Sequence, residues 1–61
     1  MRPRVFFDST NIWRRLEACA SVARAYGWSA NEIAAFTSEV RAAFSYEEAM
    51  AIIARHFEII S

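Results

Sequence analysis

The sequence predicts an all-α fold, a three-helix domain with a short extended N-terminal arm. Three observations predict it. Apolar residues recur at the helical period in three segments, residues that commonly cap helices precede these segments, and the connections between them are very short. Hydrophobic residues make up 56% of the 61 residues, so the chain has enough apolar surface to form a core. We predict an arm at residues 1–8 and a helical domain at residues 9–60, with helices at about 9–26, 30–43 and 46–60.

The opening stretch RVFFDSTNIW, at residues 4–13, has two interpretations. Its β-prone run at residues 5–7, followed by Asp8, resembles the first strand and helix of NYN/PIN-type nucleases, in which such an Asp helps to hold a catalytic metal. A nuclease of that type needs several βα units, whereas this chain has only the one β-prone run, which is too short to make a sheet. We therefore predict that Asp8 is the N-cap of the first helix, with Phe7 and Ile12 spaced as a hydrophobic staple.

The first predicted helix has one continuous apolar stripe. Its members are three or four residues apart, as one face of an α-helix requires, and they are Ile12, Leu16, Cys19, Ala23 and Tyr26. Gly27 follows directly and is the only glycine in the chain. Because glycine readily adopts the left-handed conformation that ends many helices, we predict that this helix ends at residue 26.

The second and third predicted helices both begin with a capping box. Ser29 and Glu32 form the first box, and Ser45 and Glu48 form the second. Glu47 and Glu48 thus have a structural reason to be acidic, because carboxylates in the first turn of a helix stabilise its positive end. We prefer this interpretation to a pair of catalytic carboxylates.

The third predicted helix is apolar around more than half of its circumference. One strip consists of Met50, Ile53, Phe57 and Ile60, and the adjacent strip consists of Ala49, Ile52, His56 and Ile59. A chain of this length can cover only one strip, and an exposed apolar patch usually marks an interface. We therefore predict a homodimer in which the strip at Ile52 and Ile59 packs against a second copy across a two-fold axis.

Residues 22–36 also fit the template of a helix-turn-helix, with Gly27 in the turn. The helix that would enter a DNA groove offers Ser, Ala, Asn and Glu, rather than the arginines that read guanine or contact phosphate. A basic patch near the N-terminus could still contact phosphate, and it consists of Arg2, Arg4, Arg14 and Arg15. A helix-turn-helix-like DNA-binding transcriptional regulator is therefore the alternative function.

Charge is balanced over the whole chain but not along it. Residues 1–28 contain five Arg against one Asp and one Glu, a net charge of +3, and residues 29–61 contain two Arg against five Glu, a net charge of −3. Such a dipolar chain favours head-to-tail pairing or attraction to a charged partner. A net charge of zero differs from the strongly basic balance of most nucleic-acid-binding domains.

Few side chains in the sequence could perform catalysis or hold a metal. His56 is the only histidine and Cys19 the only cysteine, so we expect neither a metal cluster nor a disulfide. Because no nucleophile and base are placed to act together, we predict a protein that is not an enzyme and uses no cofactor. The sequence has no apparent signal peptide and no apolar window as long as a membrane span, which predicts a cytoplasmic location without membrane contact.

A resemblance to small phage-encoded helical proteins of unknown function extends over residues 27–60, GWSANEIAAFTSEVRAAFSYEEAMAIIARHFEII. The common pattern is a Gly–apolar–Ser turn, an Ile-x-x-Phe helix and a short helix closing on aromatic and apolar residues. The chain departs from it at residues 43–44, where a Gly–Asp turn is usual. The resemblance implies a phage or mobile-element protein and implies no catalytic residues.

The predicted function is therefore that of a small non-enzymatic protein-binding module, a phage or mobile-element modulator of a host protein that acts as a homodimer. Its apolar and aromatic helix faces suit such contacts, because large aromatic side chains are enriched in binding hot spots. The predicted interface residues are Phe6, Trp13, Trp28, Ile52, His56 and Ile59.

Overall fold

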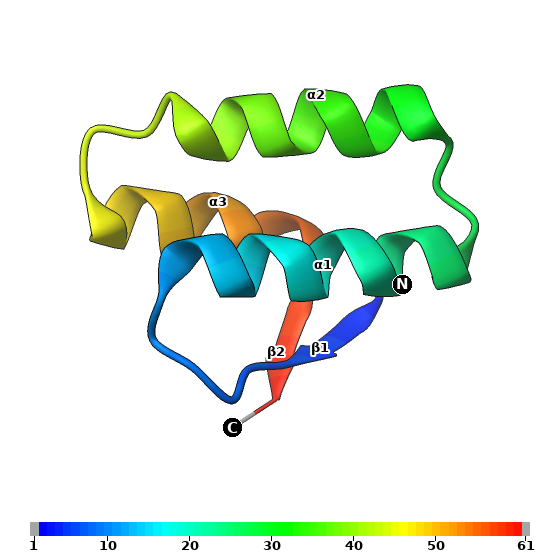
Figure 1. Cartoon of the computed structure of the whole chain (residues 1–61), viewed down its shortest axis with the longest axis horizontal. Coiled ribbons are helices and arrows are strands. Elements are labelled where there is room, and N and C mark those ends of the chain that lie inside the picture. The colour runs from blue at the N-terminus through cyan, green and yellow to red at the C-terminus, as the bar shows by residue number, and fades with distance from the viewer. Residues whose placement is uncertain (1, 61) are drawn as a thin grey trace.

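The computed structural model describes residues 2–60 and contains a strand, three helices and a second strand (Figure 1). These elements are β1 (Arg4–Phe6), α1 (Ile12–Tyr26), α2 (Ala30–Arg41), α3 (Tyr46–His56) and β2 (Glu58–Ile60). In Figure 1, α1 and α3 lie between α2 on one side and the two strands on the other. The three predicted helices are confirmed, but the chain is not purely all-α because its two end segments form a sheet. Met1, which belongs to the predicted arm, lies outside the described residues.

The sheet is parallel and joins segments from opposite ends of the chain. Val5 pairs with Ile59 and Phe6 pairs with Ile60. Val5 is only 1% exposed, because it points into the core, whereas Phe6 lies on the outer face of the sheet and is 63% exposed. The segment predicted as an extended arm is therefore extended, but it is built into the fold through Val5.

The third helix is shorter than predicted. It ends at His56, and Phe57 has an extended backbone with φ −131° and ψ 148°. The following three residues form β2 instead of a last helical turn, with Glu58 exposed and Ile59 half-buried. A short apolar run fits the period of a helix or a strand equally well, and here pairing with β1 decides between them.

The first helix begins three residues later than predicted, and Asp8 is not its N-cap. Asn11 has that position, with φ −70° and ψ 120°, and its Oδ1 accepts a hydrogen bond of 2.9 Å from the backbone N–H of Trp13. Ser9 Oγ accepts a second bond, of 3.1 Å, from the backbone N–H of Asn11. The cap lies beyond Asp8 because β1 extends to Phe6 and the chain needs several residues to turn from the sheet into α1.

Removing the Asn11 cap should destabilise the protein, whereas removing the Asp8 carboxylate should not. We expect Asn11→Ala to lower the free energy of unfolding by about 0.5–2 kcal/mol, the usual cost of losing an N-cap. Asp8→Ala is the matched control, and its effect should stay within about 0.5 kcal/mol because Asp8 is exposed. Urea denaturation followed by circular dichroism measures both, and a larger loss for Asp8→Ala would reverse the assignment.

The connection between α1 and α2 follows the predicted pattern. Gly27 has a positive φ of 113°, and its backbone N–H donates to the Ala23 carbonyl at 3.0 Å. Ser29 Oγ accepts from the backbone N–H of Glu32, and Glu32 Oε1 accepts from the backbone N–H of Ser29. The predicted helix end and the predicted first capping box are therefore both confirmed.

The core lies between the three helices and the inner face of the sheet. Its most completely buried large side chains are Phe57, Ile53, Val5 and Cys19. An aromatic cluster closes one end, where the Trp28 ring lies 5.8 Å from the Phe36 ring and 5.3 Å from the Phe57 ring. Phe36 lies in α2, and Phe57 links α3 to β2. The cluster therefore connects α2 and α3 with the sheet.

The predicted bare strip on the third helix does not exist. Ile52 is only 8% exposed and belongs to the core, and Ile59 lies in β2 rather than on α3. The prediction assumed a helix continuing to residue 60, with too little remaining chain to cover its second face. Since the sheet and α2 cover that face, Ile52 is not available for the predicted contact with a second copy.

Candidate protein-interaction surface

Three large aromatic side chains are exposed where α1 begins and where α2 connects to α3. The exposed fraction is 96% for Phe44, 57% for Trp13 and 46% for Tyr46. Scattered apolar residues are normal on a protein surface, but aromatic residues gathered around one depression are typical of binding sites. This region is therefore the candidate functional site.

The three aromatic residues line a cleft with a volume of about 310 Å³. Its floor is apolar, since Leu16, Val40 and Ala49 line it and all belong to the core. We call this space, which Arg41 also lines, the Trp13 cleft. An apolar floor with an aromatic rim provides the surface that an inserted apolar side chain requires.

Arg41 adds a polar group to the Trp13 cleft. Its guanidinium carbon lies 5.6 Å from the centroid of the Trp13 ring, in the range of a cation–π contact. Within residues 2–60, none of the ion pairs involves Arg41. A second depression of about 370 Å³, which Ala20 and Thr37 help to line, also borders on Trp13 and Arg41. The two depressions therefore share Trp13, Leu16 and Arg41 as lining residues.

The backbone around Phe44 is held in place while its ring remains in solvent. α2 ends at Arg41 with Ala42 as C-cap, which is earlier than the predicted end at residue 43. Ser45 Oγ accepts from the backbone N–H of Glu48 at 3.0 Å, but Glu48 Oε1 accepts at 2.6 Å from the backbone N–H of Phe44 rather than from that of Ser45. One half of the predicted second capping box is thus formed, and its other half fixes the loop that presents Phe44.

Phe44 was absent from the predicted interface, although the sequence contains a signal for it. Phe44 directly precedes the N-cap Ser45, at the position whose side chain usually packs against the fourth residue of the helix. That fourth residue is Ala49, which offers little surface to an aromatic ring. An aromatic residue at this position without a large partner predicts exposure.

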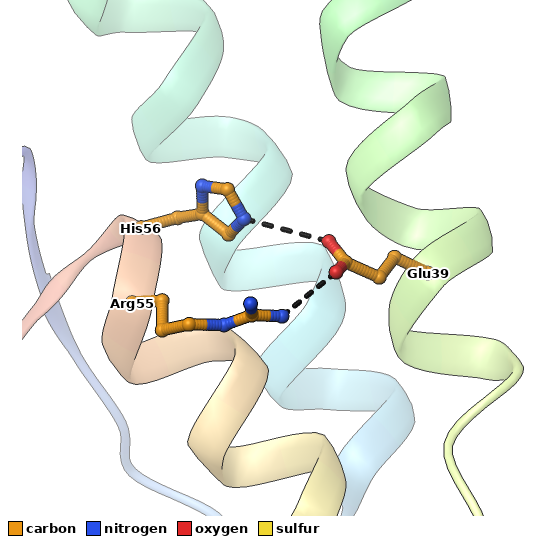
Figure 2. Close-up of polar contacts among 3 residues, drawn as sticks. All are labelled: Glu39, Arg55 and His56. Carbon is orange, nitrogen blue, oxygen red and sulfur yellow. Dashed lines mark hydrogen bonds and ion pairs between the residues drawn. The ribbon is translucent and has the colours of Figure 1, made fainter.

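A second group of polar side chains connects α2 to α3 (Figure 2). One Glu39 carboxylate oxygen lies 2.8 Å from Arg55 Nη2, and the other lies 3.4 Å from His56 Nε2. His56 and Glu39 border a depression of about 410 Å³, whose described lining contains no hydroxyl or thiol group. These contacts join α2 to α3, and an exposed ion pair such as Glu39–Arg55 contributes at most about 1 kcal/mol.

The structure does not bring the six predicted interface residues together. Trp13 lies at the Trp13 cleft, and Phe6 lies on the outer face of the sheet. Trp28 and His56 are half-buried, with ring centroids 6.0 Å apart, in the aromatic cluster at the end of the core. Ile59 is half-buried in β2, and Ile52 is buried in the core. Only Trp13 and Phe6 present a largely exposed aromatic ring.

The predicted basic patch consists mostly of arginines that already bind other groups of the protein. Arg2 donates a 2.6 Å hydrogen bond to a backbone carbonyl of α3, and Arg4 lies 3.7 Å from the carboxylate of Glu58. Arg15 is half-buried and donates at 2.6 Å to a backbone carbonyl in the segment before α1. Arg14 is exposed. Three of the four guanidinium groups therefore contact other groups of the chain, and Arg14 is the exposed exception among them.

The remaining reactive group of interest is the thiol of Cys19. It is fully buried, and desolvation raises the pKa of the thiol from 9.0 to about 12. A thiol that remains protonated at neutral pH is a poor nucleophile and a poor metal ligand, so Cys19 serves as a core residue. In the described part of the chain, no three His, Cys, Asp or Glu side chains are grouped so that they could hold a metal ion.

None of the helices within residues 2–60 is both long enough and apolar enough to cross a membrane. Comparison of the chain with protein-family models, with curated proteins and with solved structures finds no match.

Proposed function

We propose that this chain is a small non-enzymatic protein-binding module that holds a segment of another protein in the Trp13 cleft. The observation that carries the proposal is the exposure of Trp13, Phe44 and Tyr46 around one apolar depression. The segment that suits this surface is an amphipathic helix with a large apolar side chain for the cleft and a carboxylate for Arg41.

Burial of the aromatic rim supplies a driving force for such binding. An aromatic side chain typically buries about 150–250 Å², and each Å² of apolar surface removed from water contributes about 25 cal/mol. Phe44 and Trp13 retain most of that surface for a partner, since both are more than half exposed. The backbone of Phe44 is already fixed by Glu48, which reduces the conformational entropy lost on binding.

The proposal retains three further expectations from the sequence. The chain acts in the cytoplasm, it derives from a phage or mobile element and modulates a host protein, and it associates with a second copy of itself. The dimer contact must lie elsewhere than Ile52, because Ile52 is buried.

DNA binding by a helix-turn-helix is the alternative function. The helices of that motif cross at about 90–120°, whereas α1 and α2 run side by side in opposite directions (Figure 1). The exposed start of α2 presents Ala30, Asn31 and Glu32, which provide no cation for phosphate. These features favour protein binding over DNA binding.

Selection from a displayed library of random peptides tests the proposal. We expect the native chain to enrich peptides that combine large apolar residues with Asp or Glu. Phe44→Ser and Trp13→Ser should each weaken binding of the enriched peptides at least about tenfold, the loss typical of a hot-spot residue. Phe6→Ser is the matched control, because it removes an exposed aromatic ring that does not line the Trp13 cleft, and it should leave peptide affinity unchanged.

Two results would contradict the proposal. One is peptide binding that survives both cleft substitutions and is lost in Phe6→Ser. The other is specific affinity for duplex DNA that falls steeply with salt concentration, as the release of counterions from phosphate requires.

A further inference from the structure

The two-stranded sheet is incomplete by the standards of parallel sheets. Parallel sheets are usually covered on both faces. Here the helices cover one face, and Figure 1 shows no helix on the other side of β1 and β2. The outer face carries two exposed apolar side chains at one position of the register, Phe6 at 63% and Ile60 at 41% exposure.

Within residues 2–60, no second strand pairs with the edge of β1 that faces away from β2. The backbone N–H of Glu58 donates to the Pro3 carbonyl at 2.8 Å, so the carbonyl of Pro3 faces β2. Because backbone groups of successive residues in a strand point to opposite sides, those of Val5 also face β2, and those of Arg4 and Phe6 face away from it. An exposed strand edge of this kind is a template for pairing with another strand.

We propose that a second copy of this chain pairs with β1 along this edge in the antiparallel direction, forming a four-stranded sheet with β1 and its copy at the centre. The inference rests on the self-association put forward under the proposed function and assigns it to a surface. A two-fold axis through the sheet makes this contact self-complementary, as closed dimers require.

Charge complementarity selects one register of this pairing. The outward-facing residues must oppose one another, which leaves three registers centred on Arg4, Val5 or Phe6. The first places two Arg4 side chains opposite each other, which is unfavourable. The second places Asp8 opposite Arg2, whose guanidinium already donates to the Ala54 carbonyl of its own chain at 2.6 Å. The third places the two Phe6 rings opposite each other and, with pairing extended two residues past the end of β1 at Phe6, brings each Arg4 opposite Asp8 of the second copy. Opposite charges and aromatic pairs are favourable cross-strand neighbours, so we assign the register centred on Phe6.

In this register Asp8, which is not the N-cap of α1, forms an ion pair with Arg4 of the second copy. Asp8 is exposed, and Asn11 supplies the N-cap in its place. Arg4 lies between the carboxylate of Glu58 in its own chain, at 3.7 Å, and the position of the partner's Asp8. The contact is short, so the dimer belongs to the class of small, weak interfaces and requires micromolar to millimolar concentrations to form.

Sedimentation equilibrium of charge-reversed variants tests the pairing. Asp8→Arg places like charges across both symmetric contacts, and Arg4→Asp does the same with the opposite sign. We expect each single change to weaken dimerisation by about tenfold. The double variant with Arg4→Asp and Asp8→Arg should restore it, because both pairs are then again opposite in charge. The internal Arg4–Glu58 pair cannot explain such a restoration.

Disulfide formation tests the register without relying on the fold of the Arg4 variants. Phe6→Cys places two thiols opposite each other at a Cα separation of about 5.5 Å, which suits a disulfide. We expect oxidised Phe6→Cys to form a covalent dimer on a non-reducing gel. Ile60→Cys is the matched control on the same exposed face, and it should remain monomeric because β2 lies at the outside of the four-stranded sheet.

The outcomes separate this inference from the proposal on which it rests. A chain that stays monomeric at every concentration overturns both the self-association and its assignment to β1, while peptide binding at the Trp13 cleft is judged separately. A chain that dimerises with an affinity unchanged by Asp8→Arg, and whose Ile60→Cys variant crosslinks better than Phe6→Cys, keeps the self-association and overturns the assignment to β1.

Discussion

Replacing Phe57 with alanine is expected to lower the free energy of unfolding by about 3–5 kcal/mol, the usual cost of deleting a buried aromatic side chain. Phe57 is 1% exposed, and its ring lies 5.3 Å from Trp28 and 5.2 Å from Phe36. It is also the residue at which the chain changes from α3 to β2. A domain of this size has a total stability of only several kcal/mol, so the variant should be largely unfolded at 37 °C.

Thermal and urea denaturation followed by circular dichroism measure this loss. Phe57→Leu is the control, because it keeps most of the apolar volume and should cost far less than the alanine change. A loss below about 1 kcal/mol for Phe57→Ala, the level of an ordinary surface change, would show that the aromatic cluster does not hold the layers together.

Replacing Val5 with aspartate is expected to unfold the protein almost completely. Val5 is 1% exposed and pairs with Ile59, so the variant would place an unpaired carboxylate in the core. The cost of burying such a charge reaches several kcal/mol even after the protein relaxes. The expected result distinguishes a strand that is part of the fold from an arm that only precedes it.

Phe6→Asp is the matched control for this experiment. Phe6 is the next residue along β1, but it lies on the outer face of the sheet and is 63% exposed. At a low concentration, where the chain is monomeric, its unfolding free energy should stay within about 0.5 kcal/mol of the native value, as for other exposed residues. Equal effects of the two substitutions would mean that residues 4–6 do not alternate between core and solvent.

The helices were predictable because local chemistry specifies them. Gly27 ends α1 through its positive φ, and the reciprocal hydrogen bonds of Ser29 and Glu32 begin α2. Both features depend on residues within one turn of each other, so the sequence pattern carries the whole signal. The apolar stripe of α1 likewise matches its buried residues at Leu16, Cys19 and Ala23, whereas Tyr26, at the end of the predicted stripe, is 52% exposed.

The sheet was not predictable in the same way, because it depends on contacts between opposite ends of the chain. Residues 58–60 fit a helical strip as well as a strand, and only β1 provides the partner that makes them a strand. The error at Asp8 has the same origin. Asp8 and Asn11 are both good caps, and the length of β1 determines which of them meets the start of α1.

The candidate site was predicted in part. Trp13 was chosen as an interface residue, and the structure places it on the rim of a cleft. Ile52 was chosen because α3 was expected to continue to residue 60, and its burial follows from the shorter helix and from β2. Phe44 was assigned to no interface, since its exposure depends on α2 ending at Arg41 and on the hydrogen bond of its backbone to Glu48.

Photo-crosslinking in the cells that naturally contain this chain tests directly whether the chain binds protein through the Trp13 cleft. A benzoylphenylalanine in place of Phe44 should be tolerated, because Phe44 is 96% exposed. The same group in place of Asn31 is the comparison, since Asn31 is exposed on the helix that the DNA-binding alternative places in a groove. We expect a protease-sensitive adduct with a different protein from position 44 and none from position 31. A nuclease-sensitive adduct from position 31, with no adduct from position 44, would contradict this expectation.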